Sequence, residues 1–138
     1  MASEFYKAER RKGLREAPEK LEQLRQKWPK AFPTKSKDIR PLATSASKTI
    51  ATEFGWSYQY TRAILERWKL RNDYCRAVLA YQRRHTLDGL ESDEIVDEGA
   101  KMRAREMIEN RQARRQQQAS KEQDSEKTAS PQTPAILA

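Results

Sequence analysis

Apolar residues recur three or four positions apart in five separate stretches of the chain, which is the pattern of amphipathic helices. In the first stretch, Leu21, Leu24 and Trp28 share one helix face. Proline suits the first turn of a helix but interrupts its interior. The pattern therefore predicts a short helix that starts near Pro18 and ends before Pro29.

The second stretch follows a connection with two prolines, KAFPTKSKDIRPL, which we expect to be extended. Beyond it, Leu42, Ala46, Ile50 and Phe54 fall four residues apart. Gly55 comes next, and glycine readily adopts the left-handed conformation that closes a helix. A second helix that ends at Gly55 is therefore predicted.

Two adjoining helices give the strongest core signal. Ser57 can cap a helix over YQYTRAILERWKLR, and Asn72 can cap another over DYCRAVLAYQRR. The inward positions of the pair are Thr61, Ile64, Leu65, Trp68, Cys75, Val78 and Leu79. We expect these two helices to pack against each other at the centre of the domain.

The helical period breaks at RRHTLDGLES, where Asp88 and Gly89 form a strong two-residue turn signal that predicts a short hairpin. Acidic residues then cluster before the last helical stretch, where a helix N-terminus favours negative charge. The buried stripe expected of that last helix is Ala100, Ala104, Met107 and Ile108.

Together these elements predict a mainly α fold with a short β-hairpin, formed by about five helices in one compact domain over residues 17–111. Residues 1–16 are charged and weakly patterned, and we expect them to form a flexible basic tail. Residues 112–138 are biased to Gln, Ser, Lys and Glu, which predicts a fraying helix followed by a disordered tail.

The charge distribution points to a polyanionic partner. The net charge is +8, while residues 1–40 carry +6 and residues 41–90 carry +4, so the positive field belongs to the folded part of the chain. Such a field favours nucleic acid or an anionic membrane surface. The sequence has neither an apolar run of membrane-spanning length nor an apolar signal segment, so we expect a soluble cytoplasmic protein.

Few residues are suited to catalysis. Cys75 and His85 are the single cysteine and the single histidine, and there are only four glycines. These numbers argue against a zinc site, a nucleophile with its base, or a phosphate-binding glycine loop. We therefore expect a binding protein without metal or cofactor, and not an enzyme.

Several features occur in an order that resembles the ProQ/FinO family of bacterial RNA chaperones: WPKAF at a helix exit, RPL in the connector, two tandem basic helices, an LDG hairpin, and an acidic start to a basic final helix. The resemblance covers residues 20–108 and is to a minimal member, a FinO domain with short tails. It implies a monomer that binds small RNAs and messenger RNA 3' ends, gripping a terminator hairpin and its U-rich single strand on a concave surface.

The resemblance also implies site residues. Arg62 takes the place of a family arginine that contacts RNA, Tyr74 that of a surface tyrosine, and Arg84 that of the arginine before the hairpin turn. Further basic candidates are Arg83, Lys48, Lys69, Lys101 and Arg105. The chain departs from the family pattern at Ala43 and Asp73, where basic residues are common, and Lys48 or Lys69 are candidates to compensate.

Other interpretations remain open. Arg62 and Arg84 could be ordinary solvated charges, Tyr74 a core residue with a satisfied hydroxyl, and Lys101 and Arg105 partners of the acidic first turn. Residues 57–71 and 73–84 could form a helix-turn-helix that binds DNA, although its second helix would begin with a carboxylate. A charged protein-protein adaptor is a third possibility.

Overall fold

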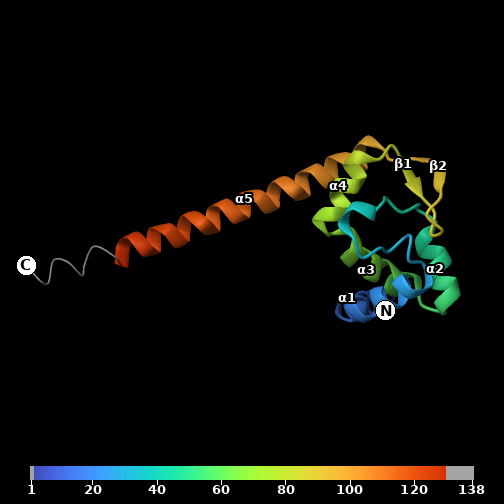
Figure 1. Ribbon diagram of the computed structural model, residues 1–138. Coiled ribbons are helices and arrows are strands. Elements are labelled where there is room, and N and C mark those ends of the chain that lie inside the picture. Colours follow the sequence, from blue (N-terminus) through green and yellow to red (C-terminus); the bar gives the residue numbers. More distant parts are fainter. Residues whose placement is uncertain (1, 130–138) are drawn as a thin grey trace, which may run out of the picture.

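The structure is a computed structural model that describes the backbone of residues 2–129 and the side chains of residues 3–122. Its elements are α1 (Ala2–Lys27), a 3-10 turn η1 (Ser36–Asp38), α2 (Ala46–Phe54), α3 (Tyr58–Lys69), α4 (Asn72–Ala80), β1 (Arg83–His85), β2 (Glu91–Ile95) and α5 (Glu98–Ala129). Figure 1 shows the helices gathered around α3, with the hairpin at one end. The prediction of a mainly α fold with a short hairpin is confirmed.

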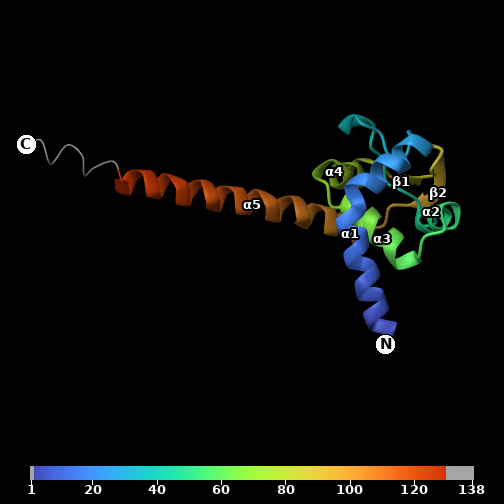
Figure 2. The ribbon, with the colours of Figure 1, turned by 90° about the horizontal axis from the view of Figure 1, so that it is seen from below.

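Helix α1 differs most from expectation. It begins at Ala2 and contains Pro18 in its interior, so the predicted start at Pro18 and the predicted flexible tail over 1–16 are wrong for residues 2–16. The helix lies along α3, as Figure 2 shows. At Gly13 an added Cβ would stand 2.7 Å from both the Ala63 Cβ and the Tyr60 carbonyl oxygen, so the absence of a side chain permits this close approach.

Helix α3 forms where the sequence predicts it, and α2 ends as predicted. The prediction that Leu42 belongs to α2 is wrong, because Leu42 pairs with His85 and α2 begins at Ala46. Gly55 follows α2 with a φ of 68°, and its N–H donates to the Ala51 carbonyl oxygen. The Ser57 hydroxyl accepts a hydrogen bond from the Tyr60 N–H at 3.2 Å and caps α3. All four predicted inward positions of α3 are buried, and the Trp68 ring meets Phe32 edge to face at a centroid distance of 5.3 Å.

The connector before α2 forms a third strand-like segment beside the hairpin. The His85 N–H donates to the Pro41 carbonyl oxygen at 2.7 Å, and the Ala43 N–H donates to the His85 carbonyl oxygen at 2.9 Å. Leu42 and His85 thereby pair in parallel, while β1 and β2 pair antiparallel. The hairpin loop spans residues 86–90 instead of the two predicted, with Gly89 at a φ of 82°.

Helix α5 starts where the acidic cluster predicts. The Asp97 carboxylate accepts a hydrogen bond from the Ala100 N–H at 2.7 Å, and Ala100 and Ala104 are buried. Beyond the domain α5 continues as one straight helix to Ala129, projecting away from the other elements in both views (Figures 1 and 2). The disordered tail predicted for the end of the chain lies, over 130–138, outside the described residues.

Candidate nucleic-acid interface

A cavity of about 740 Å³ opens where α1, α3, α4 and α5 meet the start of the hairpin. Its walls carry six basic side chains: Lys7 and Arg10 of α1, Arg62 and Lys69 of α3, Arg84 of β1, and Arg103 of α5. Among the lining residues in the described part of the chain, Glu66 is the single carboxylate, and it pairs with Arg10 at 2.9 Å. Six positive charges against one negative charge give the lining residues a formal charge of +5, and Glu94, which is not a lining residue, pairs with Arg84 at 3.2 Å.

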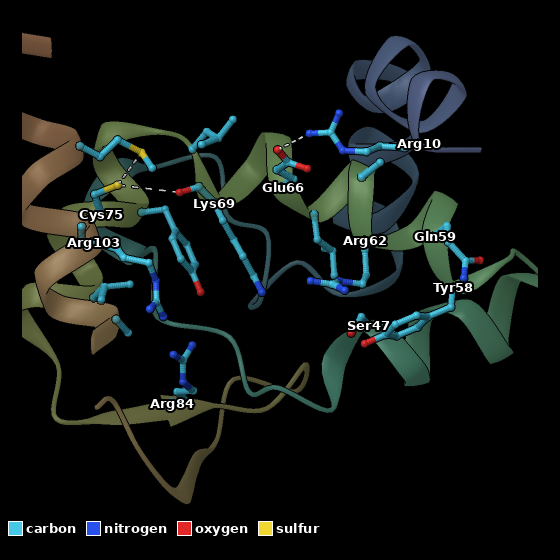
Figure 3. A pocket seen from close by; sticks show the side chains of 18 of the residues that line it. Arg10, Ser47, Tyr58, Gln59, Arg62, Glu66, Lys69, Cys75, Arg84 and Arg103 are labelled. Atoms are coloured by element: carbon cyan, nitrogen blue, oxygen red, sulfur yellow. Dashed lines mark hydrogen bonds and ion pairs between the residues drawn. The ribbon is translucent and has the colours of Figure 1, made fainter. Parts of the chain in front are cut away.

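Four of these cations converge although they come from three separate elements. In Figure 3, Arg62, Lys69, Arg84 and Arg103 point toward one shared space. Like charges held this close repel one another unless an anion lies between them. The cavity is therefore electrostatically suited to an anionic ligand.

Arg84 is held in a fixed orientation by its neighbours. Its Nε atom lies 3.2 Å from a Glu94 carboxylate oxygen, and its Nη1 atom donates to the Leu42 carbonyl oxygen at 3.1 Å. Glu94 also accepts hydrogen bonds from the Thr44 N–H at 3.1 Å and the Thr44 hydroxyl at 2.9 Å. The acidic segment at 91–98 thus does more than begin α5, because Glu94 joins Arg84 to the connector.

Tyr74 is not the surface tyrosine that the family resemblance implies. Its side chain is buried, with 4% of the residue exposed, and its hydroxyl oxygen accepts a hydrogen bond from the Leu42 N–H at 3.0 Å. Burial raises the pKa of this hydroxyl, so it stays protonated. The alternative of a core tyrosine with a satisfied hydroxyl is confirmed, although the residue still borders the cavity.

Lys69 lies half-buried between the other cations of the cavity. Burial lowers the pKa of its ammonium group, and the nearby positive charges of Arg84 and Arg62 lower it further. A bound phosphate would relieve this repulsion, because an opposite charge within a few ångströms favours the charged form of lysine.

The other predicted basic residues lie elsewhere. Lys48 is exposed on α2, and Arg83 pairs with Glu91 and Asp93, each at 3.5 Å, away from the cavity. Lys101 and Arg105 lie on a different face of α5 from the cavity-lining positions. None of these four lines the cavity in the described structure.

Sequence reasoning missed Arg103 and the basic residues of α1. Arg103 falls between Ala100 and Met107 on the predicted inward face of α5. A basic residue on that face could have been predicted to point toward the rest of the domain. Lys7 and Arg10 gave no such signal, because their segment has no strong apolar periodicity.

The two departures from the family pattern have structural explanations. Ala43 is 7% exposed and contributes its backbone N–H to the connector pairing. The Asp73 carboxylate accepts a hydrogen bond from the Ser36 hydroxyl at 3.0 Å and pairs with Arg71 and Arg76, each at 3.4 Å. Its charge is therefore compensated locally, outside the cavity lining.

The described residues lack the features of a metal site or a membrane span. No cluster of three or more His, Cys, Asp or Glu side chains suited to a metal occurs among the described residues. Cys75 is buried, and burial raises the pKa of its thiol, as expected of an inert core cysteine. None of the described helices combines the length and apolar character needed to cross a bilayer.

Comparison with known proteins identifies the family. No curated protein matches the chain. The family model described as "ProQ/FINO family" matches residues 14–121, which include the cavity-lining residues of α3, α4, the hairpin and α5. The match spans well over half of the chain. The chain therefore belongs to the ProQ/FinO family of RNA-binding proteins.

Proposed function

We propose that this chain is an RNA chaperone that holds the 3' end of structured RNA, especially an intrinsic-terminator hairpin with a U-rich single strand, in the cationic cavity. The observation that carries the proposal is the convergence of Arg62, Lys69, Arg84 and Arg103 on one space. In this role it stabilises small RNAs and promotes their pairing with messenger RNAs, acting as a cytoplasmic monomer.

The chemistry of the cavity suits RNA backbone. Lysine and arginine neutralise phosphates and release counterions, which gives affinity with little dependence on sequence. A volume of about 740 Å³ accommodates a few nucleotides but not a duplex. The stem would therefore rest against the rim while the unpaired end enters.

The helix-turn-helix alternative has less support. Helix α4 would be the recognition helix, yet it packs against α5 and buries Tyr74, Cys75, Ala77 and Val78. Its first turn carries Asp73, which would meet the phosphates of DNA. A protein adaptor has less support because the cavity is cationic. Most large apolar side chains of the described residues are buried in the core and are not available to bind another protein.

Binding to a fluorescent terminator hairpin with a U-run tests the proposal, beside the same stem without its tail and a DNA duplex of equal length. We expect preference for the tailed RNA and a log-log salt slope of about -3, since four single-strand contacts contribute about -0.7 each. Arg62→Ala and Arg84→Ala should weaken binding, whereas Arg83→Ala and Lys48→Ala serve as matched controls outside the cavity. Equal or tighter binding to DNA would overturn the proposal.

A further inference from the structure

Two exposed tyrosines line the cavity. Tyr6 of α1 is 47% exposed and Tyr58 of α3 is 43% exposed, and both line the cavity. Single exposed aromatics are common on protein surfaces. Here, however, two of them come from segments about fifty residues apart in sequence, and both line one cationic hollow.

Tyr58 is associated with a cation of the cavity. The guanidinium carbon of Arg62, one helical turn later, lies 5.6 Å from the centre of the Tyr58 ring. Figure 3 shows Tyr58 toward one end of the cavity, with Arg103 at the other end. An aromatic ring beside a guanidinium offers one surface for a base and a charge for the adjoining phosphate.

The N-terminal half of α1 is fastened to α3 at Glu66, Ala63 and Tyr60. Arg10 forms its 2.9 Å ion pair with Glu66 of α3, and the bare Cα of Gly13 allows the two helix backbones to approach. The Arg10 pair also neutralises the carboxylate that would otherwise face an RNA phosphate. Tyr6 lies one turn before Arg10 and Lys7 lies next to it, so both are carried to the cavity edge.

We propose that Tyr6 and Tyr58, with Lys7 and Arg62 beside them, form a base-stacking subsite for an unpaired nucleotide of the bound RNA. We call these four residues the aromatic shelf. The inference rests on the proposed function and extends it, because it assigns recognition of unpaired bases to α1 and the start of α3, whereas Arg84 and Arg103 hold phosphates. Every base has a face that can stack, so the shelf selects single strand over duplex without reading sequence.

Tyr6→Ala and Tyr58→Ala in the full chain test the shelf, with Leu90→Ala as the control. Leu90 is a large exposed hydrophobic residue, with 66% of its surface accessible, and it does not line the cavity. Each tyrosine substitution should weaken binding to the tailed hairpin about 5-fold to 100-fold, the range expected for one lost stacking contact. Binding to the tailless stem should stay unchanged, and Tyr58→Phe should retain wild-type affinity.

A second measurement reports stacking directly. The tail is synthesised with 2-aminopurine at successive positions, and its fluorescence should be quenched at one or two positions by the wild-type protein but not by the Tyr6→Ala, Tyr58→Ala double variant. If the wild-type protein prefers the tailed hairpin while the double variant binds and quenches equally well, the shelf is refuted and the proposed function stands. If the wild-type protein shows no preference for the tail, the proposed function itself fails.

Discussion

Replacing Tyr74 by phenylalanine separates a structural role from direct RNA contact. The substitution keeps the ring and removes the hydroxyl that accepts a hydrogen bond from the Leu42 N–H at 3.0 Å. Leu42 is 1% exposed, so water cannot easily replace the lost acceptor. The connector at Leu42 also supplies the carbonyl oxygen that holds Arg84, so the effect should extend to the RNA site.

The size of the effect follows from this burial. Leaving a buried N–H without an acceptor costs about 1 to 3 kcal/mol. We expect about 1.5 kcal/mol for Tyr74→Phe, because the connector keeps its two backbone hydrogen bonds to His85. With a urea dependence of about 2 kcal/mol per molar for a domain of this size, the midpoint should fall by about 0.5 to 1 M.

Equilibrium urea unfolding, followed by tryptophan fluorescence, measures this change. Tyr81→Phe is the control, since the Tyr81 hydroxyl has no hydrogen-bond partner among the described residues. RNA affinity of Tyr74→Phe should fall less than that of Arg84→Ala. An unchanged midpoint together with a large loss of RNA binding would refute this reasoning and restore Tyr74 to direct contact with RNA.

Three further predictions concern other parts of the structure. Gly13→Val should destabilise the protein and lower its affinity for tailed RNA, because the added Cβ would collide with the Tyr60 carbonyl oxygen. Thermal unfolding followed by circular dichroism measures the stability, and a binding titration measures the affinity. An unchanged stability would contradict the close packing of α1 on α3. Burial lowers the pKa of His85 in the folded protein. Below the ordinary histidine pKa of about 6.5, the unfolded state therefore binds a proton more readily than the folded state, and the free energy of unfolding should decrease as the pH falls. Urea unfolding at pH 7.5 and pH 5.5 should show the loss in the wild type and a smaller loss in His85→Gln. Arg103→Ala should weaken RNA binding about tenfold, because one charge-assisted contact is lost. Arg105→Ala, on the outer face of α5, should leave the affinity nearly unchanged. If the two substitutions change the affinity and its salt dependence equally, Arg103 does not contact RNA in the cavity.

The sequence predicts those elements whose boundaries are set locally. Gly55 ends α2 and Ser57 caps α3, and in both cases the responsible group lies within a few residues of the element it bounds. The inward stripe of α3 is likewise readable from its period, because large apolar side chains define it.

The parts that were missed depend on contacts distant in sequence. The N-terminal half of α1 meets α3 through small residues, with Gly13 and Ala17 buried, and small residues give little apolar periodicity. The parallel pairing of Leu42 with His85 is formed by backbone groups alone, so it cannot be predicted from the pattern of side chains along the sequence. Arg103 was overlooked because an arginine on an inward helix face is expected only if a cavity lies there.

Photocrosslinking shows whether the RNA tail occupies the cationic cavity. A terminator hairpin with 4-thiouridine in its U-rich tail is irradiated in complex with the wild-type protein, and the attached residues are mapped by mass spectrometry. We expect crosslinks confined to the segments that form the cavity walls, within 6–10, 58–78 and 100–107 and at Ser47 and Arg84. Crosslinks concentrated instead on η1 or on the projecting part of α5 would contradict it.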